Sequence, residues 1–423
     1  MEKKAIVLSG GGSKGAYQAG VWKALRRLHY HYKIVTGTSV GALNGALMVQ
    51  RDYKKCLRMW ENMDFEKIFV DPFPKKIEGI SGKANVYKRY ASSFIKNGGI
   101  NTSRFEQMVQ KMFSSFRFFR SSVDYGLVVY NFTTKKPLEI TKAEMTEKTA
   151  PLYIIGSASC FPAFPMKKIE GNQYIDGGYS DNMPINLAIA LGATEIVAVD
   201  LHAVGKKKKV TNTNVKITMI EPRNQIVSFL VFQKELSRKA ICYGYNDTMK
   251  AFHKLEGNIY TFRLGELKKQ YQKMELPLKI ALEKRLKNRK QFVEEKLLKR
   301  SIFHKLLEGE KREQLFYEII ELIGKSLKID DSKVYRMREF SREALYQLLL
   351  IDHIDFKTVE GKILEGKLRS LFGTATILRF LYDKIEMGTK NKKTEYCKYA
   401  LLFPKEFIAA TYLFLINLEY RII

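Results

Sequence analysis

The chain is short of cysteine, proline and acidic residues. Its 423 residues include four cysteines, which stand far apart and form no Cys-x-x-Cys pair. This scarcity excludes a disulfide-stapled scaffold and a thiolate zinc site, and it fits a reducing compartment. Ten prolines and 28 glycines exclude collagen-like and low-complexity chains. Hydrophobic residues make up 45% of the sequence, which excludes a disordered chain.

Long hydrophobic runs are also missing. The apolar run at residues 5–8 is too short for the core of a signal peptide. The most apolar stretch elsewhere covers residues 407–418, which is shorter than the roughly 20 residues needed to span a bilayer. We therefore expect no membrane-spanning helix. Residues 407–418 are expected to form a buried or an interfacial helix, of which the buried one is favoured.

Negative charge is scarce relative to positive charge. The sequence has 73 Lys and Arg against 44 Asp and Glu, a formal net charge of +29. A surface this positive favours polyanionic partners, either nucleic acid or an anionic membrane. The sequence contains no zinc-finger, bZIP or RNA-recognition pattern, so we expect no nucleic-acid partner.

Strand and helix patterns alternate in the first fifty residues. An apolar run at residues 5–8 is followed by glycines, and then by apolar residues at helical spacing over residues 16–28. A second strand pattern at 32–35 precedes a second helix pattern at 42–49. This repeated order predicts parallel strands in an α/β layer. Further strands of the same sheet are expected at residues 127–130, 195–199 and 216–220.

The character of the chain changes twice further along. Residues 71–120 hold ten basic but three acidic residues, with interleaved aromatics, and are expected to form an insertion or cap. That segment either docks the protein on anionic lipid or covers an acyl-chain pocket. From about residue 266 strand signals fade and amphipathic patterns begin, as at 292–307. We predict one domain over residues 1–265 and a mostly helical region over 266–423.

Residues 10–15 read Gly-Gly-Gly-Ser-Lys-Gly, between a predicted strand and a predicted helix. Gly10, Gly12 and Gly15 match G-x-G-x-x-G, a dinucleotide-binding pattern. Residues 30–40, however, contain no acidic residue to hold a ribose, and no Walker motif follows Gly15. Glycines at a helix N-terminus can equally let backbone N–H groups hold a transient oxyanion. The facing residues decide between these uses.

Residues 37–41 read Gly-Thr-Ser-Val-Gly and match G-x-S-x-G, again between a strand and a helix. Gly37 and Gly41 relieve crowding in a strained turn, so Ser39 is presented at the carboxyl end of the strand. A nucleophilic serine needs a base. None of the six histidines lies in a glycine-punctuated strand-end motif, and the best placed of them is His202.

Asp176 is a better candidate for the base. It follows a short strand pattern and precedes Gly177 and Gly178, which give a tight turn. A carboxylate within hydrogen-bond reach of Ser39, and partly removed from water, can take the hydroxyl proton as attack proceeds. The sequence therefore predicts a Ser–Asp pair.

Together, these three motifs resemble the patatin-like phospholipases. The match consists of residues 10–15, 37–41 and 176–178 in the family's order, with flanking segments at 158–162 and 181–184. The resemblance implies a three-layer α/β/α fold with a mainly parallel central sheet. It leaves the C-terminal, mostly helical region without a counterpart.

The resemblance also implies roles for individual residues. Ser39 would be the nucleophile and Asp176 the base that activates it. Backbone N–H groups of Gly11 and Gly12 would form the oxyanion hole, and Lys14 would supply the basic fifth position of the glycine motif. The supporting glycines would be Gly10, Gly15, Gly37, Gly41, Gly177 and Gly178. No cofactor or metal is implied, and the acidic residues show no EF-hand spacing.

We therefore expect a serine lipid acyl hydrolase that cleaves fatty-acyl esters of phospholipids or lysophospholipids through an acyl-enzyme. The expected partner is lipid at an anionic membrane surface, and the expected location is cytoplasmic and peripheral to the membrane. Three alternatives stay open: a neutral-lipid esterase or thioesterase, a nucleotide- or anion-binding protein, and a catalytically inactive lipid-binding module. The sequence gives no oligomeric state.

Overall fold

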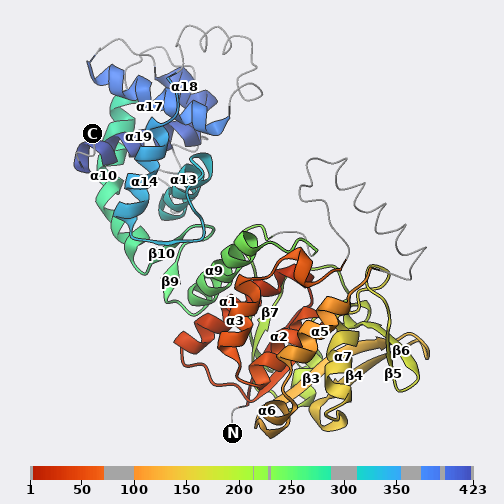
Figure 1. Ribbon diagram of the computed structural model, residues 1–423. Coiled ribbons are helices and arrows are strands. Elements are labelled where there is room, and N and C mark those ends of the chain that lie inside the picture. The colour runs from red at the N-terminus through yellow and green to blue at the C-terminus, as the bar shows by residue number, and fades with distance from the viewer. Residues whose placement is uncertain are drawn as a thin grey trace. The chain divides into compact units, whose positions relative to one another are not determined.

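A computed structural model describes residues 3–70, 100–212, 214–226, 230–286, 312–353, 373–390 and 396–420 (Figure 1). The chain divides into two compact units, residues 1–252 and 253–423. The boundary we expected, after residue 265, falls inside the second unit, because Tyr260 and Phe262 are buried in that unit's own core. Each unit is described by itself.

The first unit is built on one sheet. Its strands are β1 (Lys4–Leu8), β2 (Ile34–Thr38), β3 (Asp124–Asn131), β4 (Lys136–Thr141), β5 (Lys167–Ile169), β6 (Asn172–Asp176), β7 (Glu195–Val199) and β8 (Lys216–Ile220). Their order is β5-β6-β3-β2-β1-β7-β8, with β4 paired to β3. The run from β3 to β8 is parallel, whereas β4, β5 and β6 pair antiparallel. All the strands expected from the sequence are present; β4 and β5 were not predicted.

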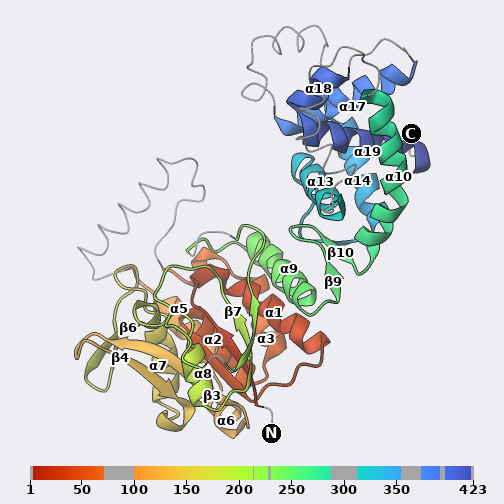
Figure 2. The ribbon, with the colours of Figure 1, turned by 180° about the vertical axis from the view of Figure 1, so that it is seen from behind.

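Helices cover both faces of this sheet. They are α1 (Gly15–Arg27), α2 (Val40–Val49), α3 (Tyr53–Glu61), α5 (Ser103–Met112), α6 (Ser115–Arg120), α7 (Thr149–Ser157), α8 (Ile185–Ala190) and α9 (Lys234–Ala251), with short 3₁₀ turns at Gly12–Lys14, Phe65–Lys67, Lys142–Glu144 and Gly177–Tyr179. Helix α8, labelled in Figure 2, covers one face, and α1, α2 and α9 pack on the other. The expected three-layer α/β/α architecture with a mainly parallel sheet is confirmed.

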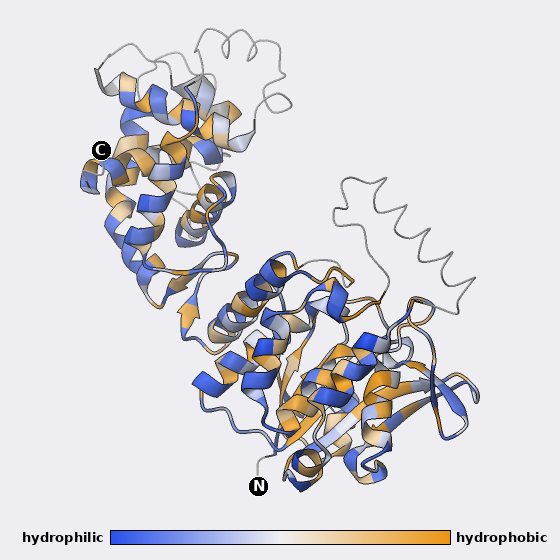
Figure 3. Cartoon of the chain, in the orientation of Figure 1, coloured by the Kyte–Doolittle hydropathy of each residue, from blue (hydrophilic) through white to orange (hydrophobic). Residues whose placement is uncertain are grey.

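Strand β1 shows why the sheet sits between two layers. Ile6 and Leu8 are buried in the core under α1 and α2, and Ala5 and Val7 are buried in the smaller core under α8. A strand covered on both faces reads as a continuous apolar run instead of an alternating one. Figure 3 shows the same pattern, with the strands mostly orange between helices that carry blue outer faces.

The expected cap over residues 71–120 lies partly outside the described residues, which resume at Ile100. Its described part forms α5 and α6. These helices are packed into the main core of the first unit, because it buries Phe105, Val109 and Phe118. Phe116, by contrast, is 65% exposed.

The second unit is mainly helical and has its own core. Its helices are α10 (Glu266–Leu286), α13 (Arg312–Ser326), α14 (Met337–Leu349), α17 (Thr374–Lys390), α18 (Cys397–Leu402) and α19 (Pro404–Tyr420), and its short strands are β9 (Leu255–Glu256), β10 (Thr261–Arg263) and β11 (Val334–Tyr335). The amphipathic pattern at 292–307 lies outside the described residues.

Helix α19 contains the apolar stretch singled out in the sequence. Its side chains from Phe407 to Leu413 are buried in the core of the second unit, so the expected burial is confirmed. Over the described ranges, no helix has both the length and the apolar character that a bilayer crossing requires.

Helices α1 and α9 approach each other at two glycines. A Cβ on Gly20 would lie 2.0 Å from the carbonyl oxygen of Ile241, and a Cβ on Gly244 would lie 2.0 Å from that of Tyr17. Beside this contact, the Tyr17 hydroxyl donates to Asp247 Oδ2 at 3.0 Å. Because backbone atoms cannot yield as a flexible side chain does, the two helices need glycine at both positions.

Replacing Gly244 with alanine is therefore expected to destabilise the protein. The added methyl group would force α9 away from α1, at a cost of about 1–3 kcal/mol for overpacking. Gly156→Ala is the matched control, because its Cβ would meet nothing closer than 3.5 Å and alanine favours a helix. Thermal unfolding of both variants tests this; equal melting temperatures for the two would contradict it.

Candidate active site

Ser39 occupies the turn between β2 and α2. Its φ of 57° and ψ of −125° lie where non-glycine residues are rarely found, at a cost of about 1–3 kcal/mol. The Ser39 N–H donates to Ser157 Oγ at 2.9 Å, and the Ser157 hydroxyl donates to the Val128 carbonyl at 2.7 Å. This chain of hydrogen bonds ties the strained turn to β3.

The two glycines of this turn allow close packing. A Cβ on Gly41 would lie 2.2 Å from the carbonyl oxygen of Leu8, and a Cβ on Gly37 would lie 2.4 Å from the backbone of Gly41. Helix α2 therefore begins against the end of β1. The glycine-rich turn starts at that same end, so Ser39 and the turn become neighbours.

Sheet register brings Asp176 to Ser39. Thr38 pairs with Val128 and Asp176 pairs with the next residue, Val129, on the same edge of β3, because β4 pairs with both Val128 and Val129 on the other edge. Successive residues of a strand lie about 3.3 Å apart, so the ends of β2 and β6 meet at this edge of β3. The Ser39 side chain is close enough to the Asp176 carboxylate to lower its pKa, and both residues line one cavity.

The surroundings of Asp176 make it a stronger base than a carboxylate in water. The residue is buried, and its Oδ1 accepts from the Gly178 N–H at 2.7 Å. Burial raises the pKa of Asp176 to about 6, while the Ser39 side chain and the hydrogen bond from Gly178 act in the opposite direction. A base whose pKa lies closer to neutral transfers a proton more effectively at neutral pH.

The glycine-rich turn divides its backbone N–H groups between two uses. The Gly10 N–H donates to Asn182, 3.1 Å from both its carbonyl oxygen and its Oδ1. Gly11 and Gly12 line the same cavity as Ser39 and Asp176. No residue in the described ranges accepts a hydrogen bond from either of these two N–H groups. They are therefore available to an oxygen bound beside Ser39.

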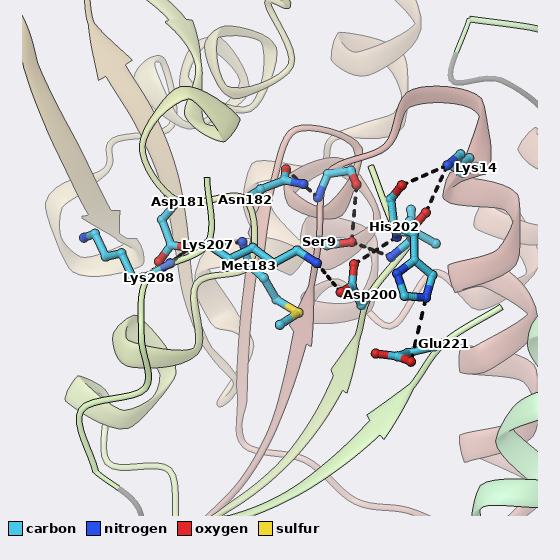
Figure 4. Close-up of polar contacts among 12 residues, drawn as sticks. Ser9, Lys14, Asp181, Asn182, Met183, Asp200, His202, Lys207, Lys208 and Glu221 are labelled. Carbon is cyan, nitrogen blue, oxygen red and sulfur yellow. Dashed lines mark hydrogen bonds and ion pairs between the residues drawn. The ribbon is translucent and has the colours of Figure 1, made fainter. Parts of the chain in front are cut away.

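Lys14 points away from this cavity. Its Nζ donates to the carbonyl oxygens of Leu201 and His202, at 3.1 and 3.3 Å (Figure 4). Partial burial lowers the pKa of Lys14, and Asp200 opposes that effect. Lys14 thus holds the loop after β7 against the glycine-rich turn.

His202, the weaker candidate for the base, lies outside the cavity. Its Nε2 is 3.7 Å from Glu221, and the side chain is 53% exposed. Among the described residues that line the cavity there is no histidine. The structure therefore brings Ser39 together with Asp176, and it does not bring His202 to the serine.

The cavity beside Ser39 has a volume of about 620 Å³ and a mostly apolar wall. Its apolar side chains come from α2, α3, α5 and the loops beside them: Val40, Leu43, Trp60, Met63, Ile68, Phe105, Met108, Phe164, Leu230 and Phe232. A narrow apolar volume next to a serine suits a hydrocarbon chain. Over the described ranges, no group of three or more His, Cys, Asp or Glu side chains is placed to hold a metal ion.

Comparison with known families identifies the domain that carries this site. The family model described as "Patatin-like phospholipase" matches residues 6–189, which include Ser39, Asp176 and both glycine motifs. Residues 6–189 belong to the patatin-like phospholipase family. The match ends within α8 and leaves the second unit uncovered.

The curated relatives align with about half of this chain. Lysophospholipase NTE1 of Mycosarcoma maydis is 27% identical over 200 residues, 47% of this chain and 10% of that protein. Patatin-like phospholipase domain-containing protein 7 of Rattus norvegicus is 28% identical over 222 residues, 50% of this chain and 14% of that protein. The chain thus spans a small part of the length of these relatives.

Two solved structures align over most of the chain. VipD from Legionella pneumophila has 14% identity and a TM-score of 0.36, covering 99% of this chain and 90% of that one. The type III effector protein ExoU has 12% identity and a TM-score of 0.30, covering 94% of this chain and 80% of that one.

The roles of three polar residues of the patatin-like domain were not predicted from the sequence, although Asn182 lies in the flanking segment 181–184. Ser157 holds the backbone of Ser39, and Asn182 holds Gly10. Asn44 is a buried hub: its Nδ2 donates to the carbonyl oxygen of Gly15 at 3.0 Å, and its Oδ1 accepts from Trp60 Nε1 at 2.9 Å. An asparagine inside the apolar run 42–49 was a visible signal for such a role, whereas nothing set Ser157 apart.

Asp176→Asn is expected to stabilise the patatin-like domain at neutral pH. Because burial raises the folded-state pKa of Asp176 to about 6 from its ordinary 3.8, the folded state binds this proton more tightly than the unfolded state does. The contribution of Asp176 to stability is therefore most favourable below about pH 4, and it is lost as the pH rises through about 6.

Urea unfolding of wild type and Asp176→Asn from pH 4 to pH 8 measures this effect. We expect the variant to be more stable by on the order of 2 kcal/mol at pH 7.5, with a difference that shrinks toward pH 4. A difference that stays constant across this pH range would contradict the burial of a charged carboxylate.

Proposed function

We propose that the protein is a serine lipid acyl hydrolase that cleaves fatty-acyl esters of phospholipids or lysophospholipids through an acyl-enzyme on Ser39. One observation carries the proposal: Ser39 and the buried Asp176, whose pKa Ser39 lowers, lie together in the wall of an apolar cavity of about 620 Å³. The family of residues 6–189 supports the same chemistry. Relatives named lysophospholipases support the substrate class.

In the first half of the reaction, Ser39 Oγ attacks the ester carbonyl while Asp176 takes the hydroxyl proton. The carbonyl oxygen becomes an oxyanion and is stabilised by the N–H groups of Gly11 and Gly12. A single donor of this kind contributes roughly 10²–10³-fold in rate. The tetrahedral intermediate then collapses, the alcohol leaves with the proton held by Asp176, and the acyl group remains on Ser39.

The second half repeats the same steps with water. Asp176, again a carboxylate, takes a proton from a water molecule as that water attacks the acyl-enzyme. The same two N–H groups hold the second oxyanion. Collapse returns the proton from Asp176 to Ser39 Oγ and releases the fatty acid, so the enzyme is restored.

The cavity wall supports a long acyl chain. Trp60, Phe105 and Phe164 offer apolar surface close to Ser39, and burying one CH₂ group contributes about 0.8 kcal/mol. The net charge of +29 supports a membrane surface rich in anionic lipid as the place where substrate is met. A neutral-lipid esterase or thioesterase would use the same machinery. A phosphate- or nucleotide-binding site gives no role to the juxtaposition of Ser39 and Asp176.

Ser39→Ala is expected to lose nearly all hydrolysis of a long-chain fluorogenic ester, because no other group takes the acyl chain. Asp176→Asn should lower kcat/KM by on the order of 10²–10⁴-fold, the range of general acid–base catalysis. A fluorophosphonate probe should label the wild type and fail to label Ser39→Ala.

Ser237→Ala is the matched control for these variants, because Ser237 is buried in α9 and does not line the cavity. It should keep both turnover and labelling. Retained hydrolysis in a folded Ser39→Ala would rule out the proposed nucleophile.

The pH dependence of kcat/KM is expected to follow Asp176. Since the pKa of Asp176 is raised to about 6 and the carboxylate is the active form, kcat/KM should fall about tenfold per pH unit below 6 and level off above 7. Stopped-flow or steady-state assays from pH 4.5 to 8.5 measure the inflection. An inflection near 4 would indicate a solvated carboxylate and would contradict the environment described here.

A further inference from the structure

One cationic residue is found among the described residues that line the cavity, and it is not the lysine of the glycine motif. Lys206 lines the cavity together with Ser39, Asp176 and Gly178. Lys14 does not line it, because its ammonium group is held by backbone carbonyls. The cationic residue that lines this site therefore comes from the loop after β7.

The backbone of Lys206 is fixed against the turn that follows Asp176. The Lys206 N–H donates to the Gly178 carbonyl at 2.9 Å, and its own carbonyl accepts from the Asn182 N–H at 2.5 Å. Gly205 allows this approach, because a Cβ there would lie 2.8 Å from Asn182 Cβ. These two hydrogen bonds thus fix the backbone of Lys206 beside Asp176, the proposed acid–base residue.

The neighbouring lysines are held by carboxylates. Lys207 pairs with the buried Asp200 (Figure 4), and Lys208 pairs with Glu139. Residues 206–209 form a loop, and these two side chains are paired with carboxylates. Within the described ranges, no carboxylate forms a salt bridge with Lys206, so its charge is available to an anion in the cavity.

Lys206 lies on the side of the site where the alcohol part of an ester substrate is expected. Asp176 protonates the departing alcohol in the proposed reaction, so the alcohol must lie next to Asp176 and its turn. Lys206 is anchored on that turn, whereas Trp60 and Phe105 form the apolar wall that suits the acyl chain. In a phospholipid or lysophospholipid the alcohol carries a phosphodiester, a singly charged anion that a lysine ammonium can hold.

We propose that Lys206 binds the phosphodiester of the substrate and so selects phosphate-bearing lipids over neutral lipids. This inference rests on the proposed function for the direction of the substrate, but the anion site can be tested without turnover. The lysine ammonium contributes by charge-assisted hydrogen bonds at the leaving-group side, and it takes no part in the bond-breaking steps.

Binding can be followed through Trp60, which lines the cavity. The probes are an ether-linked lysophospholipid with a brominated alkyl chain and the matching brominated alkylglycerol, both below their aggregation concentrations. Neither can be hydrolysed, and a bromine atom near Trp60 quenches its fluorescence. The two ligands differ in the phosphate-bearing head group, so their dissociation constants separate anion binding from chain binding.

Lys206→Gln is expected to raise the dissociation constant of the lysophospholipid by on the order of tenfold and to leave that of the alkylglycerol unchanged. Lys206→Arg should restore most of the affinity. Lys209→Gln is the matched control: Lys209 is exposed in the same loop but does not line the cavity, so both constants should stay at wild-type values.

Three outcomes would overturn the proposal. They are equal losses for both ligands in Lys206→Gln, no loss for either, and no quenching of the wild type by the lysophospholipid. Inorganic phosphate alone should bind far more weakly; binding as tight as that of the lipid would assign the site to free phosphate. A selective effect of Lys206→Gln in a protein that hydrolyses no ester would leave the anion site intact and reject the hydrolase.

Discussion

A carboxylate kept out of water beside a strained serine is the central constraint of the first unit. Burial of Asp176 raises its pKa, and the Ser39 side chain partly offsets that effect. A buried charge of this kind is unfavourable for folding unless its surroundings satisfy it. The surrounding structure can be understood as the set of contacts that hold this pair in place.

Those contacts come from backbone more than from side chains. The strained φ of Ser39 is held by Ser157, whose hydroxyl is bonded to β3, and Asp176 is held through its own N–H and that of Gly178. Strand β3 pairs with both elements along one of its edges, at Val128 and Val129. Because these supports are anchored on α7, on β3 and on the turn after β6, the geometry of the pair is a property of the fold, in line with the rule that precise sites are built on rigid elements.

The sequence predicted the parts of this arrangement that depend on local pattern. The β1–α1–β2–α2 order follows from apolar periodicity and glycine placement, and the G-x-S-x-G and Asp-Gly-Gly motifs marked Ser39 and Asp176. Antiparallel strands β4 and β5 were missed because they are short, half-exposed edge strands with weak alternation.

Side-chain positions that depend on tertiary contacts could not be predicted from the sequence. Ser157, Asn182 and Lys206 reach the site only because segments far apart in the chain are brought to one edge of the sheet. Lys14 matched the expected motif position, yet its ammonium group is used by carbonyls of another loop. The second unit begins earlier than expected because a few residues of weak strand character, including Tyr260 and Phe262, belong to its core.

The two units have separate hydrophobic cores, and the family match lies wholly within the first. Each core is made of residues of its own unit. A substitution inside the core of the helical unit therefore changes none of the core contacts that position the serine.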